Sequence, residues 1–402
     1  MKMHKGWIMI LVMALLLSGC QGNPAGAEDQ ESTAIYEWMA GESPVPNRRI
    51  GTKRMGITNV DCAVSPTGIY IIPEVYVDLD EGRRGLAEGF YILYADHSSD
   101  TFRKLCGRSD CTHDTEDCNA WLYRGNGLSY YQGKLYAFTG GGAFNDEHKL
   151  IRMEPDGSRH KEIFDFQEFA TEQGAAFAQA EMMVDGYCEF HLYTWHEEAD
   201  GGMTDEWMKT YIYKLDGSWK EPRPLDAVGD PICQCGDMIL ALSGGPVEYK
   251  CWSMDLEEVT STCLTDWSDS DIWYTDQQSY LFENGVFLYR DHDSGGEEFL
   301  ADTGLKGNYR AFAFPDCILV ASRDEGESAD NNLYIYNWSY ELVDAVELDF
   351  DYKYSASRTV MEETAERILL TDISSSSCIP LYYIEKSELG TGNVQLHEYQ
   401  YE

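Results

Sequence analysis

A degenerate unit of four short strands recurs along this 402-residue chain and constrains its fold more than any other feature. In the clearest copy, residues 128–138 alternate around Gln132-Gly133 as a hairpin does, and residues 149–164 alternate around the turn Pro155-Asp156-Gly157-Ser158. Similar second hairpins begin at positions 91, 150, 211, 249, 299, 333 and 381. Their mean spacing is about 48 residues, which lies within the range of propeller repeats.

This period predicts an all-β fold, a β-propeller of seven four-stranded antiparallel blades over residues 50–402. Two packed β-sandwiches are the alternative, but they do not explain why paired hairpins recur. We expect a strand within residues 56–64 to close the ring by completing the last blade near residues 367–399. One helix is expected at residues 166–174, as an insertion before the third unit.

The first twenty residues indicate export. Lys2 and Lys5 precede an apolar run over residues 7–17, which is too short to span a bilayer and is typical of a signal peptide. The ending Leu17-Ser18-Gly19-Cys20 resembles the lipobox of bacterial lipoproteins. That resemblance implies that Cys20 is acylated, for example with palmitate, and begins the mature chain. An ordinary cleaved signal followed by a chance cysteine is the alternative.

These features divide the chain into a signal peptide (1–19), a lipidated cysteine with a flexible tether (20–49) and the propeller domain (50–402). The tether is expected because residues 21–32 are small, polar and acidic. The implied location is the outer face of a bacterial cytoplasmic membrane, with the lipid on Cys20 as the attachment.

The strong acidity of the chain excludes some partners. Its formal net charge is −40, and the mature chain would carry −42 because Lys2 and Lys5 are removed. Proteins bind the phosphates of nucleic acid with Lys and Arg side chains, so nucleic acid is not an expected partner of this acidic chain. Anionic lipid headgroups would also repel the domain, so attachment must come from the acyl chains. Cationic partners are compatible with this charge, and simple solubility explains it equally well.

Residues 106–118 form the segment with the most definite chemistry. Cys106, Cys111, His113 and Cys118 lie within thirteen residues, and three thiolates with one imidazole are an accepted ligand set for structural Zn²⁺. A disulfide between two of these cysteines, with the third paired to Cys62 or left as a thiol, or a plain structural loop, is favoured over the metal. Either arrangement would hold a loop in place between the first two blades.

Several of these motifs together resemble a family of β-propeller lipoproteins from Gram-positive gut anaerobes, within the TolB-like and WD40-like propeller superfamily. The motifs are Tyr131-Gln-Gly-Lys-Leu-Tyr136, the Asp-Gly-Ser turns at residues 156–158 and 216–218, and the cysteine segment 106–118. The resemblance spans most of the mature domain. It implies architecture and location but no activity, because fold and function separate.

Two further motifs carry weaker signals. Cys251 and Cys263 flank the turn at residues 255–258, so a cross-strand disulfide is a possibility beside two core thiols. Asp291, Asp293 and Asp302 match part of a calcium loop, but position five is glycine and the flanks look like strands. A solvated loop is the better interpretation there, and calcium is not expected as a cofactor.

No nucleophile–base pair, open metal site or cofactor motif can be assembled from the sequence. The predicted function is therefore a surface-anchored binding or scaffold module for an extracellular protein, peptide or glycan. Its contacts are expected on loops 140–147, 197–206 and 291–298, whose acidity predicts a cationic partner. The alternative is a glycosidase-like hydrolase with a carboxylate pair in the central cleft.

Overall fold

The described part of the chain is built almost entirely from antiparallel strands. The chain separates into two compact units, residues 1–33 and 34–402, and all described residues belong to the second. The computed structural model describes residues 36–43, 62–73, 76–79, 83–86, 89–113, 115–123, 126–140, 148–184, 186–197, 203–225, 233–235, 238–243, 248–253, 258–260, 271–274, 278–291, 293–324, 330–348, 356, 360–371 and 379–402. None of the helices in these residues is long and apolar enough to cross a membrane.

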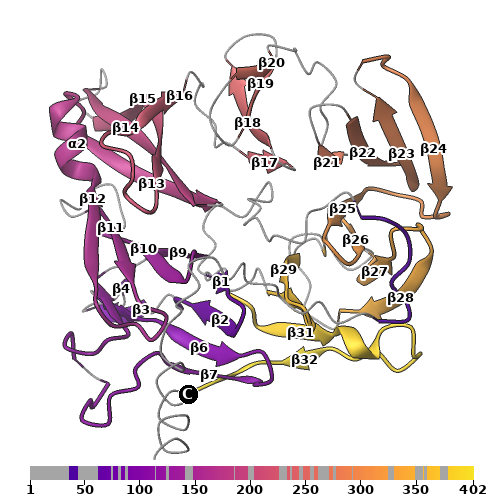
Figure 1. Ribbon diagram of the computed structural model, residues 1–402, viewed down its shortest axis with the longest axis horizontal. Helices are drawn as coiled ribbons and strands as arrows, with labels where there is room; N and C mark the ends of the chain where they lie inside the picture. Colours follow the sequence, from indigo (N-terminus) through magenta and orange to yellow (C-terminus); the bar gives the residue numbers. More distant parts are fainter. Residues whose placement is uncertain are drawn as a thin grey trace, which may run out of the picture. The chain divides into compact units, whose positions relative to one another are not determined.

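The first sheet contains five strands (Figure 1). Two separate short strand pairs are formed by other strands of the same part of the sequence. The sheet has the order β1 (Cys62–Val64), β2 (Gly68–Ile71), β6 (Leu93–Asp96), β7 (Thr101–Lys104) and β33 (Gln400–Tyr401). The two pairs are β3 (Tyr76–Leu79) with β4 (Arg83–Leu86), and β5 (Gly89–Tyr91) with β8 (Trp121–Tyr123).

Six four-stranded antiparallel sheets follow among the described residues, each made of consecutive strands. The second is β9 (Asn126–Tyr131), β10 (Lys134–Thr139), β11 (Lys149–Met153) and β12 (Lys161–Asp165). The third is β13 (Phe177–Val184), β14 (Tyr187–Glu197), β15 (Met203–Lys214) and β16 (Arg223–Leu225). The fourth is β17 (Cys233–Cys235), β18 (Met238–Ser243), β19 (Glu248–Ser253) and β20 (Glu258–Thr260).

The last three sheets have the same form. The fifth is β21 (Asp271–Tyr274), β22 (Gln278–Glu283), β23 (Val286–Asp291) and β24 (Glu297–Asp302). The sixth is β25 (Tyr309–Ala313), β26 (Ile318–Ser322), β27 (Asn332–Tyr336) and β28 (Leu342–Glu347). The seventh is β29 (Val360–Glu363), β30 (Arg367–Leu370), β31 (Tyr382–Glu385) and β32 (His397–Glu398), with the 3₁₀ helix η3 (Lys386–Glu388) after β31.

Neighbouring sheets pack face to face, which makes this fold a β-propeller. Buried apolar clusters join the first sheet to the second, the second to the third, the fifth to the sixth, and the sixth to the seventh. A further cluster joins the seventh sheet back to the first, with Ile69 and Phe102 against Leu369 and Tyr383. The all-β propeller prediction is confirmed, and the number of blades in the closed ring stays a prediction.

The expected helix is present as α2 (Phe166–Glu172). Asp165 caps it, because its side chain accepts a hydrogen bond from the backbone N–H of Glu168 at 2.9 Å. Phe166 and Ala170 are buried in the cluster between the second and third sheets, so the helix adds apolar surface to that seam.

The fifth repeat differs from its sequence assignment. We expected a second hairpin to begin at Phe299, but Phe299 lies in β24, the last strand of the fifth sheet. The hairpin in that sheet is β23–β24, so the unit begins thirteen residues earlier, at Val286. Val286–Tyr289 is a short, continuous apolar run, and its pattern alone did not distinguish the second strand of the unit from the third.

The ring closes through the C-terminus, and the expectation of an N-terminal closing strand is wrong. The seventh sheet takes its outer strand from β32, while β33 continues across to the first sheet and pairs in parallel with β7. The described end of the predicted segment, Cys62–Val64, pairs with β2 inside the first sheet. Arg367 strengthens the contact between the seventh sheet and the first. Its side chain is 4% exposed and donates to the carboxylate of Glu385 at 2.8 Å and to the carbonyl of Ser99 at 2.6 Å.

We predict that deleting residues 400–402 destabilises the propeller by about 2–4 kcal/mol. The deletion removes the backbone hydrogen bonds from Gln400 to Asp100 and from Glu402 to Phe102, together with the Tyr401 ring that stacks on Phe102. The midpoint of denaturant unfolding measures the effect.

Glu402→Gln is the matched control for this deletion. It removes only the ion pair with Arg103, whose two side chains are 70% and 63% exposed, so the midpoint should change little. An unchanged midpoint in the deletion variant would show that β33 does not close the ring.

Residues 36–43 pack against the sixth and seventh sheets, although residues 20–49 were expected to form a flexible tether. We call residues 36–43 the N-terminal strap. The indole of Trp38 donates to the carbonyl of Lys386 at 3.0 Å, and the backbone N–H of Ser339 donates to the carbonyl of Ala40 at 3.0 Å. Trp38 also packs against the apolar cluster between these sheets. The tether prediction is therefore wrong for this stretch, because these hydrogen bonds and the partial burial of Trp38 stabilise its ordered conformation.

Candidate metal centre

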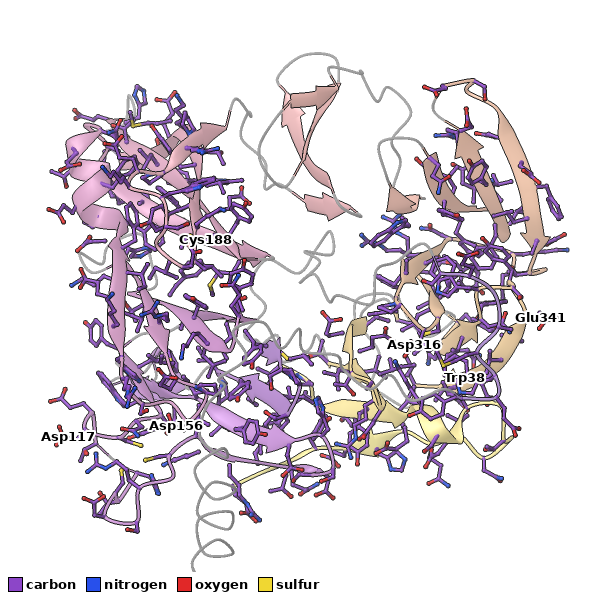
Figure 2. The ribbon with its side chains drawn as sticks, in the orientation of Figure 1. Trp38, Asp117, Asp156, Cys188, Asp316 and Glu341 are labelled. Atoms are coloured by element: carbon purple, nitrogen blue, oxygen red, sulfur yellow. The ribbon has the colours of Figure 1, made fainter. Side chains whose placement is uncertain are left out.

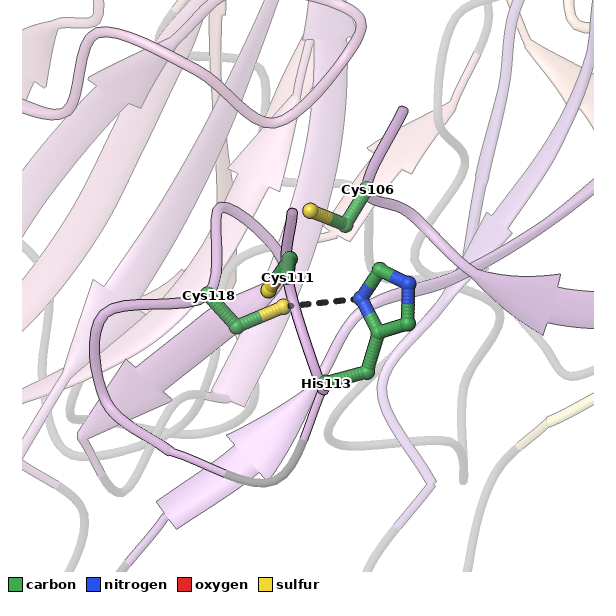
Figure 3. A group of neighbouring side chains, drawn as sticks. All are labelled: Cys106, Cys111, His113 and Cys118. Atoms are coloured by element: carbon green, nitrogen blue, oxygen red, sulfur yellow. Dashed lines mark hydrogen bonds between the residues drawn. The ribbon is translucent and has the colours of Figure 1, made fainter. Parts of the chain in front are cut away.

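Residues 105–120 connect β7 to β8, and this connection gathers three thiols and one imidazole. The ligand atoms of Cys106, Cys111, His113 and Cys118 all lie within 4.8 Å of one another (Figure 3). Cys118 Sγ lies 3.6 Å from His113 Nδ1, the contact marked by the dashed line. Among the described cysteines, none of these three takes part in a disulfide. The four residues converge as their short spacing predicts.

Local backbone contacts turn the connection back on itself. The backbone N–H of Cys118 donates to the carbonyl of Thr115 at 3.1 Å, which forms a tight turn before the last ligand. His113 has φ of +58°, in the left-handed region that non-glycine residues enter uncommonly. The ammonium of Lys104 donates to the carbonyl of His113 at 2.6 Å and holds that conformation. Such backbone strain concentrates at functional sites.

A turn of the second sheet supports the connection from the other side. Gly157, in the turn between β11 and β12, has φ of +76°, and a Cβ there would lie 2.9 Å from the carbonyl oxygens of both Leu105 and Asn119. His160 Nε2 lies 3.0 Å from the carbonyl oxygen of Asn119. Asp117 in the connection and Asp156 in the turn are labelled in Figure 2. The cluster therefore lies where the first sheet meets the second, as the sequence predicts.

Hydrogen bonds and burial give the thiols different acidities. Burial acts to raise the pKa of the Cys106 thiol, but backbone hydrogen bonds from Arg108 and Asn119, with the neighbouring thiols, lower it overall. Cys118 is 2% exposed, and burial raises the pKa of its thiol to about 11. A cation at the centre of the cluster would favour the thiolate of Cys118, since metal ligands must be deprotonated.

The cluster fits the geometry of a four-coordinate metal site. Zn–S bonds of about 2.3 Å and Zn–N bonds of about 2.0 Å place tetrahedral ligand atoms about 3.3–3.8 Å apart. The observed ligand atoms, at no more than 4.8 Å, would need to contract by about 1 Å. Three thiolates and one imidazole could therefore hold a metal ion. Such a shell has no position left for a substrate, so the role of the ion would be structural.

The other predicted site residues do not form a site among the described residues. Cys20 and Cys263 lie outside them. Cys251 lies in β19, where its Cα partners are Leu240 and Thr260. The possible disulfide between Cys251 and Cys263 therefore stays a prediction.

The cation-loop interpretation is wrong. Asp291 ends β23 beside the turn, whereas Asp302 ends β24 opposite Val286, at the far end of the same strand pair. Five residues of strand separate the two aspartates by about 16 Å, too far to share one ion. Their carboxylates instead cap turns: Asp291 accepts from the backbone N–H of Ser294, and Asp302 accepts from that of Gly304, each at 2.8 Å.

Sequence reasoning missed the residues that support the cluster. Lys104 contacts the backbone of the ligand His113, and Gly157 and His160 contact Leu105 and Asn119 at the ends of the connection. The Asp-Gly-Ser signal at residues 156–158 predicted a turn, but its docking against residues 105–119 depends on the packing of two sheets. No local pattern encodes that contact.

Together, the fold and the cluster define an all-β propeller with a Cys₃His centre between its first two sheets. The sequence matches no protein-family model, and no curated protein is significantly similar to it. Three solved structures with similar folds were compared.

A puromycin-hydrolysing peptidase from Mycobacterium tuberculosis is 10% identical, with a TM-score of 0.44, over 90% of this chain and 57% of the peptidase. TolB from Acinetobacter baumannii is 12% identical, with a TM-score of 0.28, over 63% and 58% of the two chains. The β-propeller domain of the Trilobed protease from Pyrococcus furiosus is 11% identical, with a TM-score of 0.34, over 69% and 92%. This chain thus spans little more than half of the peptidase. Similarity at this level carries no functional argument.

Proposed function

We propose that this protein is an exported, lipid-anchored β-propeller that binds an extracellular protein, peptide or glycan. The leader and the Leu-Ser-Gly-Cys sequence ending at Cys20 support anchoring. An exposed aromatic side chain, such as Trp195 on β14 or Phe299 on β24, offers a large contact area for a ligand.

We propose further that Cys106, Cys111, His113 and Cys118 hold one structural Zn²⁺. The ion would fasten the connection from β7 to β8 against the second sheet and so keep two adjacent blades in register. The number of protein ligands in this cluster is the observation that favours binding over catalysis. Among the described residues this is the one cluster with metal-ligating chemistry, and its four protein donors leave no open position.

Screening the full chain in neutral detergent against peptide and glycan arrays tests the binding function. Saturable binding of one ligand class, without turnover, is the expected result. Hydrolysis of an oligosaccharide on the array would instead favour the glycosidase alternative. Absence of binding to both arrays would contradict the proposal.

We predict that Cys20→Ala releases the protein from membranes. Protein extracted from membranes should have a mass larger than the polypeptide from Cys20 by a diacylglyceryl group, and it should partition into the detergent phase. The variant should partition into the aqueous phase, because the acidic domain has no affinity of its own for anionic lipid. Ser32→Ala, in the same segment, should behave like the natural chain. A Cys20→Ala protein that still requires detergent for extraction would contradict the lipid anchor.

A further inference from the structure

The hairpin of β14 and β15 extends beyond its neighbouring strands. Phe177, the first residue of β13, pairs with Tyr193, so the last four residues of β14 lie beyond β13. On the other side, β16 pairs only with Thr210–Ile212 of β15. The two strands nevertheless stay paired up to Glu197 and Met203. We call residues 194–197 and 203–209 the β14–β15 ribbon.

An aromatic stack supports the base of this ribbon. Phe177 is 6% exposed, and its ring lies parallel to that of Tyr193 with centroids 5.0 Å apart. The ring of Trp195 contacts Phe177 at 5.2 Å and is 37% exposed. The indole is therefore held on a buried aromatic base while part of its surface stays in solvent. A pre-positioned aromatic surface loses little conformational entropy on binding.

The ribbon is also strongly acidic. Its residues include Glu197, Asp205 and Glu206, against one lysine. Alternation along the strand places Glu197 on the same face as Trp195, and Asp205 is the backbone partner of Trp195 in the register. An exposed indole beside carboxylates favours a cationic side chain, which gains both cation–π and ionic attraction. A neutral glycan would gain only the stacking contact.

We propose that the β14–β15 ribbon binds a segment of a partner protein that is rich in lysine or arginine. One cationic side chain lies over the exposed ring of Trp195, and the carboxylate of Glu197, on the same face of the ribbon, attracts another. This inference rests on the proposed function of the protein as a binding module. It narrows the partner to a cationic polypeptide and places the contact on the third sheet.

Fluorescence anisotropy with the full chain in neutral detergent tests this inference. The probe is a labelled nine-residue peptide that alternates lysine with threonine, and the same peptide with glutamate at each lysine is the control. We expect only the lysine peptide to bind, with an affinity that falls as NaCl is raised. Trp195→Ala should weaken binding about fivefold, while Trp195→Phe should retain most of it.

Phe299→Ala is the matched control, because Phe299 is an exposed aromatic in another sheet and the neighbouring Glu297 is already ion-paired with Arg290 at 2.7 Å. It should leave binding unchanged. The inference is overturned if the lysine peptide does not bind, if Trp195→Ala binds as well as the natural chain, or if Phe299→Ala weakens binding equally. Thermal unfolding of each variant separates loss of contact from loss of fold. An array ligand that still binds Trp195→Ala would overturn the ribbon site and leave the proposed binding function standing.

Discussion

Replacing Lys386 with methionine is expected to destabilise the propeller by about 3–5 kcal/mol. Lys386 is fully buried, and its ammonium lies 2.5 Å from Asp316 Oδ2 and 2.7 Å from Glu363 Oε2. Asp316 belongs to the turn between β25 and β26 and is labelled in Figure 2, whereas Glu363 ends β29. The cluster therefore joins the sixth sheet to the seventh. Methionine would leave two buried carboxylates without a cation.

Denaturant unfolding of Lys386→Met, compared with two further variants, checks this expectation. Lys134→Met removes a partly exposed pair with Glu154 and should cost no more than about 1 kcal/mol. Adding Asp316→Asn and Glu363→Gln to Lys386→Met should recover most of the loss, because no buried charge then remains. If Lys386→Met and Lys134→Met unfold at similar midpoints, the cluster does not hold the two sheets together.

The same cluster predicts a direction of pH dependence. Burial acts to lower the pKa of Lys386, but the carboxylates of Glu363 and Asp316 outweigh it, and the pKa is raised. A raised pKa in the folded state means that this contribution is fully present below the ordinary lysine pKa of 10.5 and is lost as pH rises through the folded pKa. The natural chain should therefore lose stability above about pH 10.5 more steeply than Lys386→Met.

Removing the zinc that we propose for the Cys₃His cluster is expected to destabilise the junction of the first two blades by about 4 kcal/mol, the stabilisation given by a ligand at a thousand times its dissociation constant. Protein purified without chelator should contain about one zinc per chain. A strong chelator or Cys118→Ser should remove the metal and lower the unfolding temperature. The connection from β7 to β8 has few other buried contacts of its own to replace the ion.

Cys188→Ser provides the matched control for Cys118→Ser. Cys188 is 1% exposed in the cluster between the second and third sheets, so its loss should lower stability without changing the zinc content. Elemental analysis with thiol counting after unfolding distinguishes the alternatives. Protein without metal and with two fewer reactive thiols in this segment would show a disulfide and contradict the zinc centre.

Sequence reasoning predicted the repeating architecture because hairpins carry local signals. Alternation about Gln132-Gly133 and the turn at residues 155–158 are encoded within a few residues, and both hairpins form in the second sheet. The helix at Phe166 was also predictable, since Asp165 caps it. The fifth unit was misplaced because a short apolar run such as Val286–Tyr289 looks the same in any position of a blade.

The candidate centre was predictable for a related reason. All four ligands lie within thirteen residues, so a short connection can bring them together without help from distant parts of the chain. Its supports were not predictable. Gly157 and His160 contact residues about forty positions away, across the seam between two sheets.

The sequence by itself determined the repeating hairpins and the composition of the Cys₃His cluster, because each depends on residues near one another in the chain. Only the tertiary structure decided how the ring closes, since β33 pairs with β7 about 300 residues away. It also decided that Trp38 lies against Lys386 and that Lys386 meets Asp316 and Glu363. Such contacts depend on which sheets become neighbours, and that arrangement is set by burial of apolar faces that no single repeat encodes.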